Sequence, residues 1–554
     1  MNSPGTNYED NSIGGIAAST DVRGKAADSY TLLKQDALML LALACLSLMA
    51  ALDGTSISVA LPVISEELNA STIEAFWIGT SFLVCSAVFQ PVFSSFSDLF
   101  GRKPFVLLAI TLFFIGAVVA CIANDTLHMF IGRSLQGVGG GGIITLTSIV
   151  IADIVPLRHR GKYLGMLGAI WSLGTVIGPV VGGCFTQKAS WRWVFYINLP
   201  FIGIGLILVA WSSSFRTGKI SVSSHWRKID FIGIFLFTAS TASFLIPLSW
   251  GGILYPWDSW HTLTPLITGT IGLCTFGAFE CRIAIHPIIP PAIFSNRTAL
   301  ILFTECIALG LMIWCCLYFL PLYYAAVKGL GPIMTGVALF PETFTVAPAA
   351  VVIGLLINYT GQYYYIICIG WFLSTIGMGL LCLLNTNTKT IVWIFLNLVP
   401  GLGLGMILPA VALAIQASAK PENLAISVAM STFFRGFGQS IAVAIGGVIF
   451  QNRMKSNLLK YPALETLAEE YSSDAATVVQ TIQRMEDGQV RIDLQQAYAD
   501  SLKIVWAFCC GLSGLILSMS IFTKSYDLNR VLVTKRDSRE ENASKEGNRA
   551  AENC

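Results

Sequence analysis

Fourteen apolar runs divide the chain, and each is long enough to cross a lipid bilayer. A membrane-spanning helix rises about 1.5 Å per residue and needs about 20 apolar residues. In hydrocarbon, only helices and closed barrels satisfy every backbone hydrogen bond, and the runs are uniformly apolar rather than alternating, which excludes a barrel. We therefore expect an all-α polytopic membrane protein with fourteen spans. They begin near Ala37, Ala75, Pro104, Met129, Tyr163, Trp193, Ile229, Leu263, Ala299, Ile333, Tyr363, Ile391, Ala425 and Leu502.

The composition excludes several other classes of protein. Of 554 residues, 54% are hydrophobic and only 12% are charged, whereas soluble proteins average about 25% charged residues. The net charge is +2, without a basic tract, so we expect no nucleic-acid partner. Nearly all of the 14 cysteines lie in the apolar runs without metal-ligand spacing. We interpret them as packing residues and expect neither a metal site nor a cofactor.

Basic residues are concentrated in alternate loops, and this asymmetry predicts the orientation. Cytoplasmic loops of membrane proteins are enriched in lysine and arginine. One set of loops carries Arg102, Lys103 and the basic residues of segments 158–162 and 216–228, while the opposite loops carry few. The first set is predicted to be cytoplasmic, and an even number of spans places both termini inside. The sequons at Asn69 and Asn124 then lie outside, where we expect glycosylation, although three other sequons fall inside.

Three polar segments lie outside the apolar runs. Residues 1–36 and 525–554 are polar or charged tails that we expect to be disordered and cytoplasmic. The long outer segment 451–501 is interpreted as a surface elaboration, with a lid over the transport path as the alternative. Apolar residues at helical spacing predict two short amphipathic helices within it; they are Leu464, Leu467 and Tyr471, then Val478, Ile482 and Met485.

Ionisable residues within the apolar runs are the first candidates for function, because burying a charge in a bilayer is costly. The histidines lie in loops or at the ends of spans, so a proton carrier inside the membrane must be a carboxylate. Asp53 is the best candidate, with helix packing through Thr55 or Ser56 as the alternative. An interfacial role is favoured for Asp153, and Arg133 could extend to the membrane surface. The full set is Asp53, Arg133, Asp153, Glu305, Glu342 and Arg435.

Glycine runs are the second feature of the predicted spans. None follows a strand and opens a helix, as a nucleotide-binding motif would. In the fifth span, glycines recur every four residues and form a smooth face, while a proline removes one backbone hydrogen bond. We expect a bendable helix at a moving interface; its residues are Gly174, Gly178, Pro179, Gly182 and Gly183.

Several motifs resemble those of the fourteen-span drug:proton antiporters in the major facilitator superfamily. They occur in order at residues 52–62 (LDGTSISVALP), 97–103 (SDLFGRK), 133–137 (RSLQG), 174–183, 191–200 (WRWVFYINLP) and 434–440 (FRGFGQS). Residues 75–82 (AFWIGTSF) and the long last outer loop look most like fungal toxin and multidrug exporters.

The resemblance implies a fold of two six-helix bundles, at residues 37–213 and 299–524, with helices seven and eight inserted between them in residues 214–298. It also implies alternating access and export of hydrophobic toxins, secondary metabolites or drugs, driven by proton entry. Expected partners are a small hydrophobic substrate, protons and the lipid bilayer. The protein is expected to be a monomer in the plasma membrane, with a vacuolar or vesicular membrane as the alternative.

The resemblance also implies roles for individual residues. Asp53, Arg133 and Glu305 would belong to the cavity and proton coupling, and the glycines and proline of the fifth span would form the antiporter hinge. Two further groups follow the family motifs: Asp98, Gly101, Arg102 and Lys103 as a cytoplasmic latch to the second bundle, and Arg435 and Gly438 as a second-bundle motif. The latch motif departs from the family pattern, with Ser94 in place of glycine and Leu99 in place of a basic residue.

Two other functions remain open from the sequence. The first is a proton-coupled importer, for example of ferric siderophores, which the glycine face of the fifth span disfavours. The second is a membrane sensor or intramembrane enzyme. The tail is short for signalling, and no buried histidine supplies a catalytic cluster, so we expect no catalytic residues. An ATP-driven pump is excluded because the sequence has no phosphate-binding P-loop motif.

Overall fold

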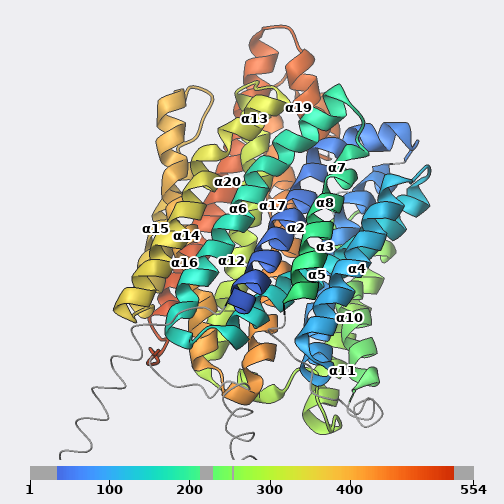
Figure 1. Ribbon diagram of the computed structural model, residues 1–554. Coiled ribbons are helices and arrows are strands. Elements are labelled where there is room, and N and C mark those ends of the chain that lie inside the picture. Colours follow the sequence, from blue (N-terminus) through green and yellow to red (C-terminus); the bar gives the residue numbers. More distant parts are fainter. Residues whose placement is uncertain (1–33, 71, 213–228, 252–254, 474, 529–554) are drawn as a thin grey trace, which may run out of the picture.

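The computed structural model describes residues 34–70, 72–212, 229–251, 255–473 and 475–528. Almost all of the two tails predicted to be disordered lies outside these residues. Within them the chain folds into helices, of which 14 are long and apolar enough to cross a membrane. The expected all-α architecture with fourteen spans is therefore confirmed (Figure 1).

The first six spans form one bundle. Its helices are α2 (Lys34–Glu67), α3 (Thr72–Phe100), α4 (Arg102–Cys121), α5 (Thr126–Ile154), α6 (Leu157–Lys188) and the pair α7 (Trp193–Tyr196) and α8 (Asn198–Trp211). The last six spans form the second bundle: α12 (Arg297–Leu322), α14 (Phe340–Thr360), α15 (Tyr364–Leu381), α16 (Thr390–Ser418), α17 (Leu424–Leu458) and α20 (Gln489–Ser520). Between them in sequence lie the inserted helices α10 (Phe231–Trp250) and α11 (Trp260–Arg282).

The two bundles have the same internal pattern of helix pairing. In the first, α2 packs on α6, α5 on α3 and α4, and α4 on α8. In the second, α12 packs on α17, α16 on α14 and α15, and α15 on α20. The bundles meet along two seams, α6 with α14 and α3 with α17. Because α10 contacts both α3 and α17, the inserted pair covers one seam only.

Local signals in the sequence define several helix boundaries. Asp125 caps α5 by accepting a hydrogen bond from the backbone N–H of His128 at 2.7 Å, and Asn296 caps α12 through Thr298. Such caps satisfy N–H groups that have no partner within the helix. Gly101 separates α3 from α4 with φ at 100°, a conformation that a residue with a side chain rarely adopts.

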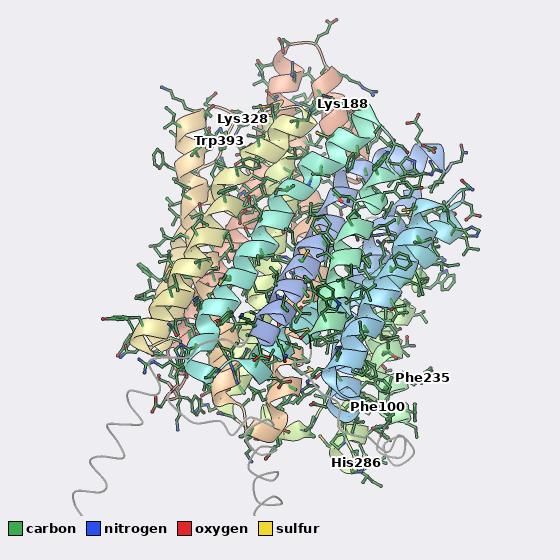
Figure 2. The ribbon with its side chains drawn as sticks, viewed as in Figure 1. Phe100, Lys188, Phe235, His286, Lys328 and Trp393 are labelled. Atoms are coloured by element: carbon green, nitrogen blue, oxygen red, sulfur yellow. The ribbon has the colours of Figure 1, made fainter. Side chains whose placement is uncertain are left out.

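The two ends of the molecule are distinct. The terminal face is the end at which α2 begins and α20 ends, and Phe100 and His286 lie toward it in Figure 2. The loop face is the opposite end, where Figure 2 shows Lys188 and Lys328. Asn69 and Asn124 are exposed in connections at the loop face, so glycosylation of these residues stays a prediction.

A helical cap covers the second bundle at the loop face. It comprises the end of α17, α18 (Ala468–Ser473), α19 (Ala475–Arg484) and the start of α20. The predicted short helices are thus confirmed, and Leu464 and Ile482 are fully buried. The last span begins well before Leu502, because hydropathy marks only the part of a helix that contacts lipid. Gln483 anchors the cap by donating to the carbonyls of Ala325 and Leu330.

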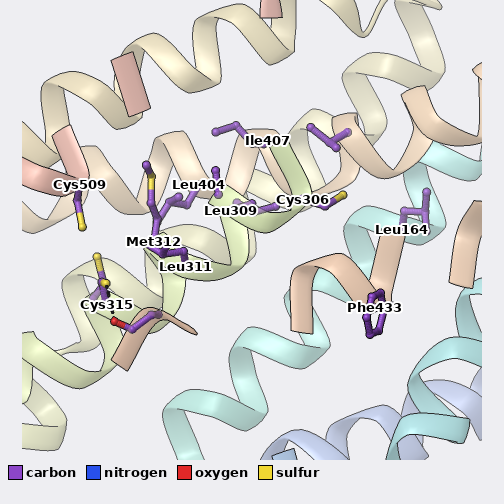
Figure 3. Close-up of a cluster of buried hydrophobic side chains, with 14 of the residues drawn as sticks. Leu164, Cys306, Leu309, Leu311, Met312, Cys315, Leu404, Ile407, Phe433 and Cys509 are labelled. Carbon is purple, nitrogen blue, oxygen red and sulfur yellow. Dashed lines mark hydrogen bonds between the residues drawn. The ribbon is translucent and has the colours of Figure 1, made fainter. Parts of the chain in front are cut away.

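The second bundle is held together by a continuous apolar core. Figure 3 shows Cys306, Cys315 and Cys509 among leucine, isoleucine and methionine side chains of this core. Buried cysteine behaves as a small hydrophobic residue. The arrangement agrees with the interpretation of these cysteines as packing residues.

Candidate functional site

A buried polar cluster centred on Asp53 joins three helices of the first bundle. The Asp53 carboxylate accepts hydrogen bonds from Arg133 Nη1 at 2.6 Å, Gln136 Nε2 at 3.1 Å and Asn198 Nδ2 at 2.7 Å. All four residues are buried. A buried ion pair persists only with close geometry and further hydrogen bonds, and α2, α5 and α8 together supply both.

Arg133 points into the bundle rather than toward the membrane surface. Its guanidinium lies over the ring of Phe82, 4.6 Å from the centroid, and it also donates to Gln136 Oε1 at 3.0 Å. The sequence also left open that Asp53 serves helix packing through a hydrogen bond with Thr55 or Ser56. Thr55 donates to the carbonyl oxygen of Ala51 at 2.8 Å. Asp53 is thus engaged by three side chains of other helices.

Glycines in α5 allow the close packing that places Arg133. A Cβ at Gly137 would lie 2.6 Å from the carbonyl oxygen of Phe82 in α3, and one at Gly139 would lie 2.5 Å from the backbone nitrogen of Phe113 in α4. These distances are shorter than any van der Waals contact, so only glycine fits without moving the helices. The run therefore packs α5 tightly against α3 and α4.

The glycine face of α6 packs against α2 within the first bundle. Side chains at three positions would overlap α2: Gly174 faces Ala51, Gly178 faces Thr55 and Gly182 faces the carbonyl of Ser56. Gly183 makes only an ordinary contact with Val59, and Pro179 lies within α6. This packing holds the part of α2 that carries Asp53. A hinge in α6 stays a prediction.

Among the described residues, three helices of the first bundle and four of the second line a central cavity between the bundles. It holds about 1100 Å³ of space, part of it continuous with solvent. A smaller pocket adjoins it and includes Gly54, Thr55 and Phe82, the neighbours of the Asp53 cluster. Trp171, Trp314, Glu342, Arg435 and Gln439 line the cavity, and all except Glu342 also line the smaller pocket.

The second-bundle motif positions Arg435 at this cavity. A side chain at Gly310 of α12 would overlap the carbonyl oxygen of Arg435, and a side chain at Gly438 would overlap that of Ile307. The backbones of α12 and α17 are therefore in direct contact on both sides of Arg435. This contact fixes where the guanidinium enters the cavity.

The predicted latch residues cluster at the terminal face. Arg102 donates to Asp98 and to Asp153 at 2.7 Å each and to Ser97 Oγ at 2.7 Å. Lys103 donates to the carbonyls at the end of α8. These described contacts of Arg102 and Lys103 all lie within the first bundle, so a latch to the second bundle stays a prediction.

Other residues connect the bundles near the terminal face. Arg160 Nη1 donates to Gln416 Oε1 at 3.3 Å, and His159 Nδ1 lies 2.7 Å from Asn358 Oδ1. Beside them, a Cβ at Gly161 would lie 3.1 Å from the carbonyl oxygen of Gly354. These contacts of α6 with α14 and α16 could not be predicted from the sequence, because they depend on which helix faces meet.

Glu305 lies apart from the Asp53 cluster. It is fully buried in the second bundle, where Ser520 Oγ donates to its Oε1 at 2.6 Å. It is not among the described residues that line the central cavity. The structure therefore brings together Asp53 and Arg133 but not Glu305.

Sequence reasoning missed the roles of several residues in the site. Gln136 and Asn198 occur in recognised motifs, yet only the tertiary structure shows that both bind Asp53. Trp171, Trp314 and Gln439 line the cavity, but nothing in hydropathy separates a tryptophan that faces a cavity from one that faces lipid.

Comparisons with known proteins agree with this architecture. The family model described as "Major Facilitator Superfamily" matches residues 43–443. The human organic anion transporter MFSD10 (TETRAN) has a similar structure, with a TM-score of 0.57 over 88% of this chain and 99% of that chain. Its sequence identity is 12%, so this likeness concerns the fold alone.

Curated relatives match nearly the whole chain. "MFS transporter L2" of Phoma sp. is 49% identical, covering 91% of this chain and 85% of the relative. "MFS-type efflux pump LUC4" of Fusarium sp. is 35% identical over 92% of both chains. "Efflux pump FUS6" of Gibberella moniliformis is 34% identical, covering 91% of this chain and 90% of the relative. The chain therefore belongs to the Major Facilitator Superfamily of membrane transporters.

Proposed function

We propose that this protein exports small hydrophobic molecules, such as secondary metabolites or toxins, in exchange for protons. The observation that carries the proposal is the cavity between two similarly paired bundles, which adjoins a buried carboxylate. Relatives named efflux pumps support the direction of transport. Export for self-protection favours the plasma membrane.

Alternating access requires that contacts between the bundles break and re-form. The contacts of α6 with the second bundle near the terminal face are well suited to this, because they include glycine backbones on α14 and a few hydrogen bonds, such as Arg160 with Gln416 of α16. Small residues let helices approach closely and separate without interlocking side chains. Opening these contacts would connect the cavity with the terminal face.

Proton coupling would act through the Asp53 cluster. A proton on Asp53 removes the charge that balances Arg133, which weakens their ion pair. Phe82 lies against the Arg133 guanidinium and also lines the smaller pocket, as does Gly54, the residue after Asp53. A change in the Asp53–Arg133 ion pair would therefore be passed on through Phe82 and Gly54, which line the pocket that a substrate would occupy.

Dye retention in cells stripped of their own pumps tests this proposal. The dyes are neutral Nile red, cationic rhodamine 6G and anionic 7-(diethylamino)coumarin-3-carboxylic acid. We expect wild type to lower retention of at least one dye, and both Asp53→Asn and collapse of the proton gradient to restore it. Asp258→Asn, an exposed residue, is the matched control at equal membrane abundance.

Each other outcome contradicts a defined part of the proposal. Lower retention that ignores the gradient would exclude proton coupling but not export. Unchanged retention of all three dyes would contradict export of this class of compounds. Increased uptake of ferric siderophores under iron limitation would indicate an importer instead.

A further inference from the structure

The central cavity contains the guanidinium of Arg435, which none of the described residues neutralises. Among the described residues, none forms an ion pair with Arg435 or accepts a hydrogen bond from it. Arg102, Arg133 and Arg160, in contrast, each have close partners. Arg435 lines both the main cavity and the smaller pocket. It therefore lies where a ligand would pass or bind.

An unpaired arginine in this position needs a compensating anion. The guanidinium remains protonated in proteins, and an isolated charge within a bilayer is costly. Glu342 is the one acid among the described residues that line the cavity, yet it forms no ion pair with Arg435. A carboxyl group can lose its charge by binding a proton, whereas a guanidinium has no such route. The compensating anion is therefore expected on the ligand.

The surroundings of Arg435 indicate what else the ligand carries. Trp171 of the first bundle and Trp314 of the second line the same space, and both offer large flat apolar surfaces. Thr432 and Gln439, on the same helix as Arg435, add neutral hydrogen-bonding groups. One fixed cation among aromatic and neutral polar groups suits an anionic group attached to an apolar body.

Close helix packing holds Arg435 in place. Gly310 and Gly438 keep α12 and α17 in backbone contact around it. A guanidinium presented from a rigid backbone can bind a carboxylate through two parallel hydrogen bonds. Because the backbone is already fixed, ligand binding costs mainly the conformational entropy of the arginine side chain.

We propose that Arg435 is the anion-binding residue of the cavity, and that the transported molecules are hydrophobic carboxylic acids. The carboxylate binds the guanidinium, and the apolar body lies between Trp171 and Trp314. This inference rests on the proposed export function and names its class of substrate.

Binding to the purified full-length protein in lipid nanodiscs tests the inference. The probes are 7-(diethylamino)coumarin-3-carboxylic acid and its N-methyl amide, which share a fluorophore and differ in charge. We expect wild type to bind the acid about 10- to 100-fold more tightly than the amide, since hydrogen bonds to charged groups are the stronger ones. Arg435→Gln should remove this preference and change binding of the amide less than about twofold, a difference small in free energy.

Two further variants separate charge from structure. Arg435→Lys keeps the cation but not the paired geometry, so it should retain part of the preference for the acid. Arg453→Gln removes an exposed arginine from the same helix and should leave both affinities unchanged. Equal weakening of both probes by Arg435→Gln would overturn the inference, because it would indicate a structural role.

Failure of this inference is distinguishable from failure of the export function. Equal wild-type affinity for the acid and the amide would overturn the assignment of acids, while dye export in cells would still stand. If the wild-type protein bound neither probe, the inference would also be overturned, because it assigns the cavity to hydrophobic carboxylic acids such as this probe. If cells showed no dye export while the purified wild-type protein still bound the acid more tightly than the amide, only the export function would be contradicted.

Discussion

Arg133 and Arg435 are both arginines within membrane-spanning helices, but their surroundings differ. Arg133 is fully buried in the first bundle, bound to Asp53 and Gln136 and packed on Phe82. Arg435 is partly exposed at the cavity between the bundles, without a partner among the described residues. The comparison teaches that, among the described residues, one intramembrane arginine is paired with a carboxylate of its own bundle and the other is not.

The largest expected difference is in stability after loss of each arginine. Arg133→Met would leave the Asp53 carboxylate buried without a cation, and breaking a buried pair costs about 3–5 kcal/mol. Arg435→Met removes a charge that has no partner among the described residues, so it should leave stability unchanged or increased. Denaturant unfolding of the purified variants in detergent checks this. Equal losses of stability in Arg133→Met and Arg435→Met would contradict the expectation that Arg133 has a buried partner and Arg435 does not.

The double variant Asp53→Asn with Arg133→Met sharpens that test. Removing both charges avoids an uncompensated one, so the double variant should be more stable than Arg133→Met alone. A double variant that is less stable would mean that packing against Phe82, rather than the ion pair, dominates this site.

A second test displaces Arg435 without changing it. Gly310→Ala places a methyl group against the Arg435 carbonyl oxygen, and such overpacking costs about 1–3 kcal/mol. We also expect weaker binding of the acid probe, because α17 must shift. Gly447→Ala on α17 is the control, since no atom lies within 4 Å of the added Cβ. Unchanged acid binding in Gly310→Ala would show that the exact position of α17 matters little.

The smallest expected effect on stability is at Arg192, because its ion pair with Glu67 is exposed to water. Arg192 donates to Glu67 at 2.5 Å at the loop face, and this hydrogen bond lowers the pKa of Glu67 below its ordinary value. Glu67→Gln should cost only about 0.2–1 kcal/mol at neutral pH, because solvent screens exposed pairs.

The pH dependence of that small effect has a defined sign. Because the folded pKa of Glu67 is the lower one, its contribution is present above the pKa of an unfolded glutamate, about 4.3. It is lost as the pH falls through the folded pKa. Unfolding of wild type and Glu67→Gln should therefore converge in acid. A difference that grows in acid would contradict this assignment.

Much of the fold could be predicted because the bilayer imposes simple rules. The number of spans follows from the thickness of the hydrocarbon core. Their helical structure follows from the need to pair every backbone hydrogen-bonding group within it. Helix ends beyond the bilayer did not follow: α20 begins at Gln489, because its first residues pack in the cap rather than against lipid. Hydropathy carries no information about such packing.

The candidate site was predictable in part for the same reason. Charge within a span is rare and costly, so the sequence alone singled out Asp53, Arg133, Asp153, Glu305, Glu342 and Arg435. Which of these charges meet is a property of helix packing between segments far apart in the chain. The spacing of residues along one helix cannot show which charges pair and which do not.

The sequence by itself determined fourteen membrane spans and the short set of intramembrane charges, because both follow from transfer of side chains between water and hydrocarbon. Only the tertiary structure decided that Asn198, far along the chain, binds Asp53, and that Arg435 lines a cavity with no partner among the described residues. The physical reason is that pairing depends on which helix faces meet, and close approach at Gly310 and Gly137 sets those faces.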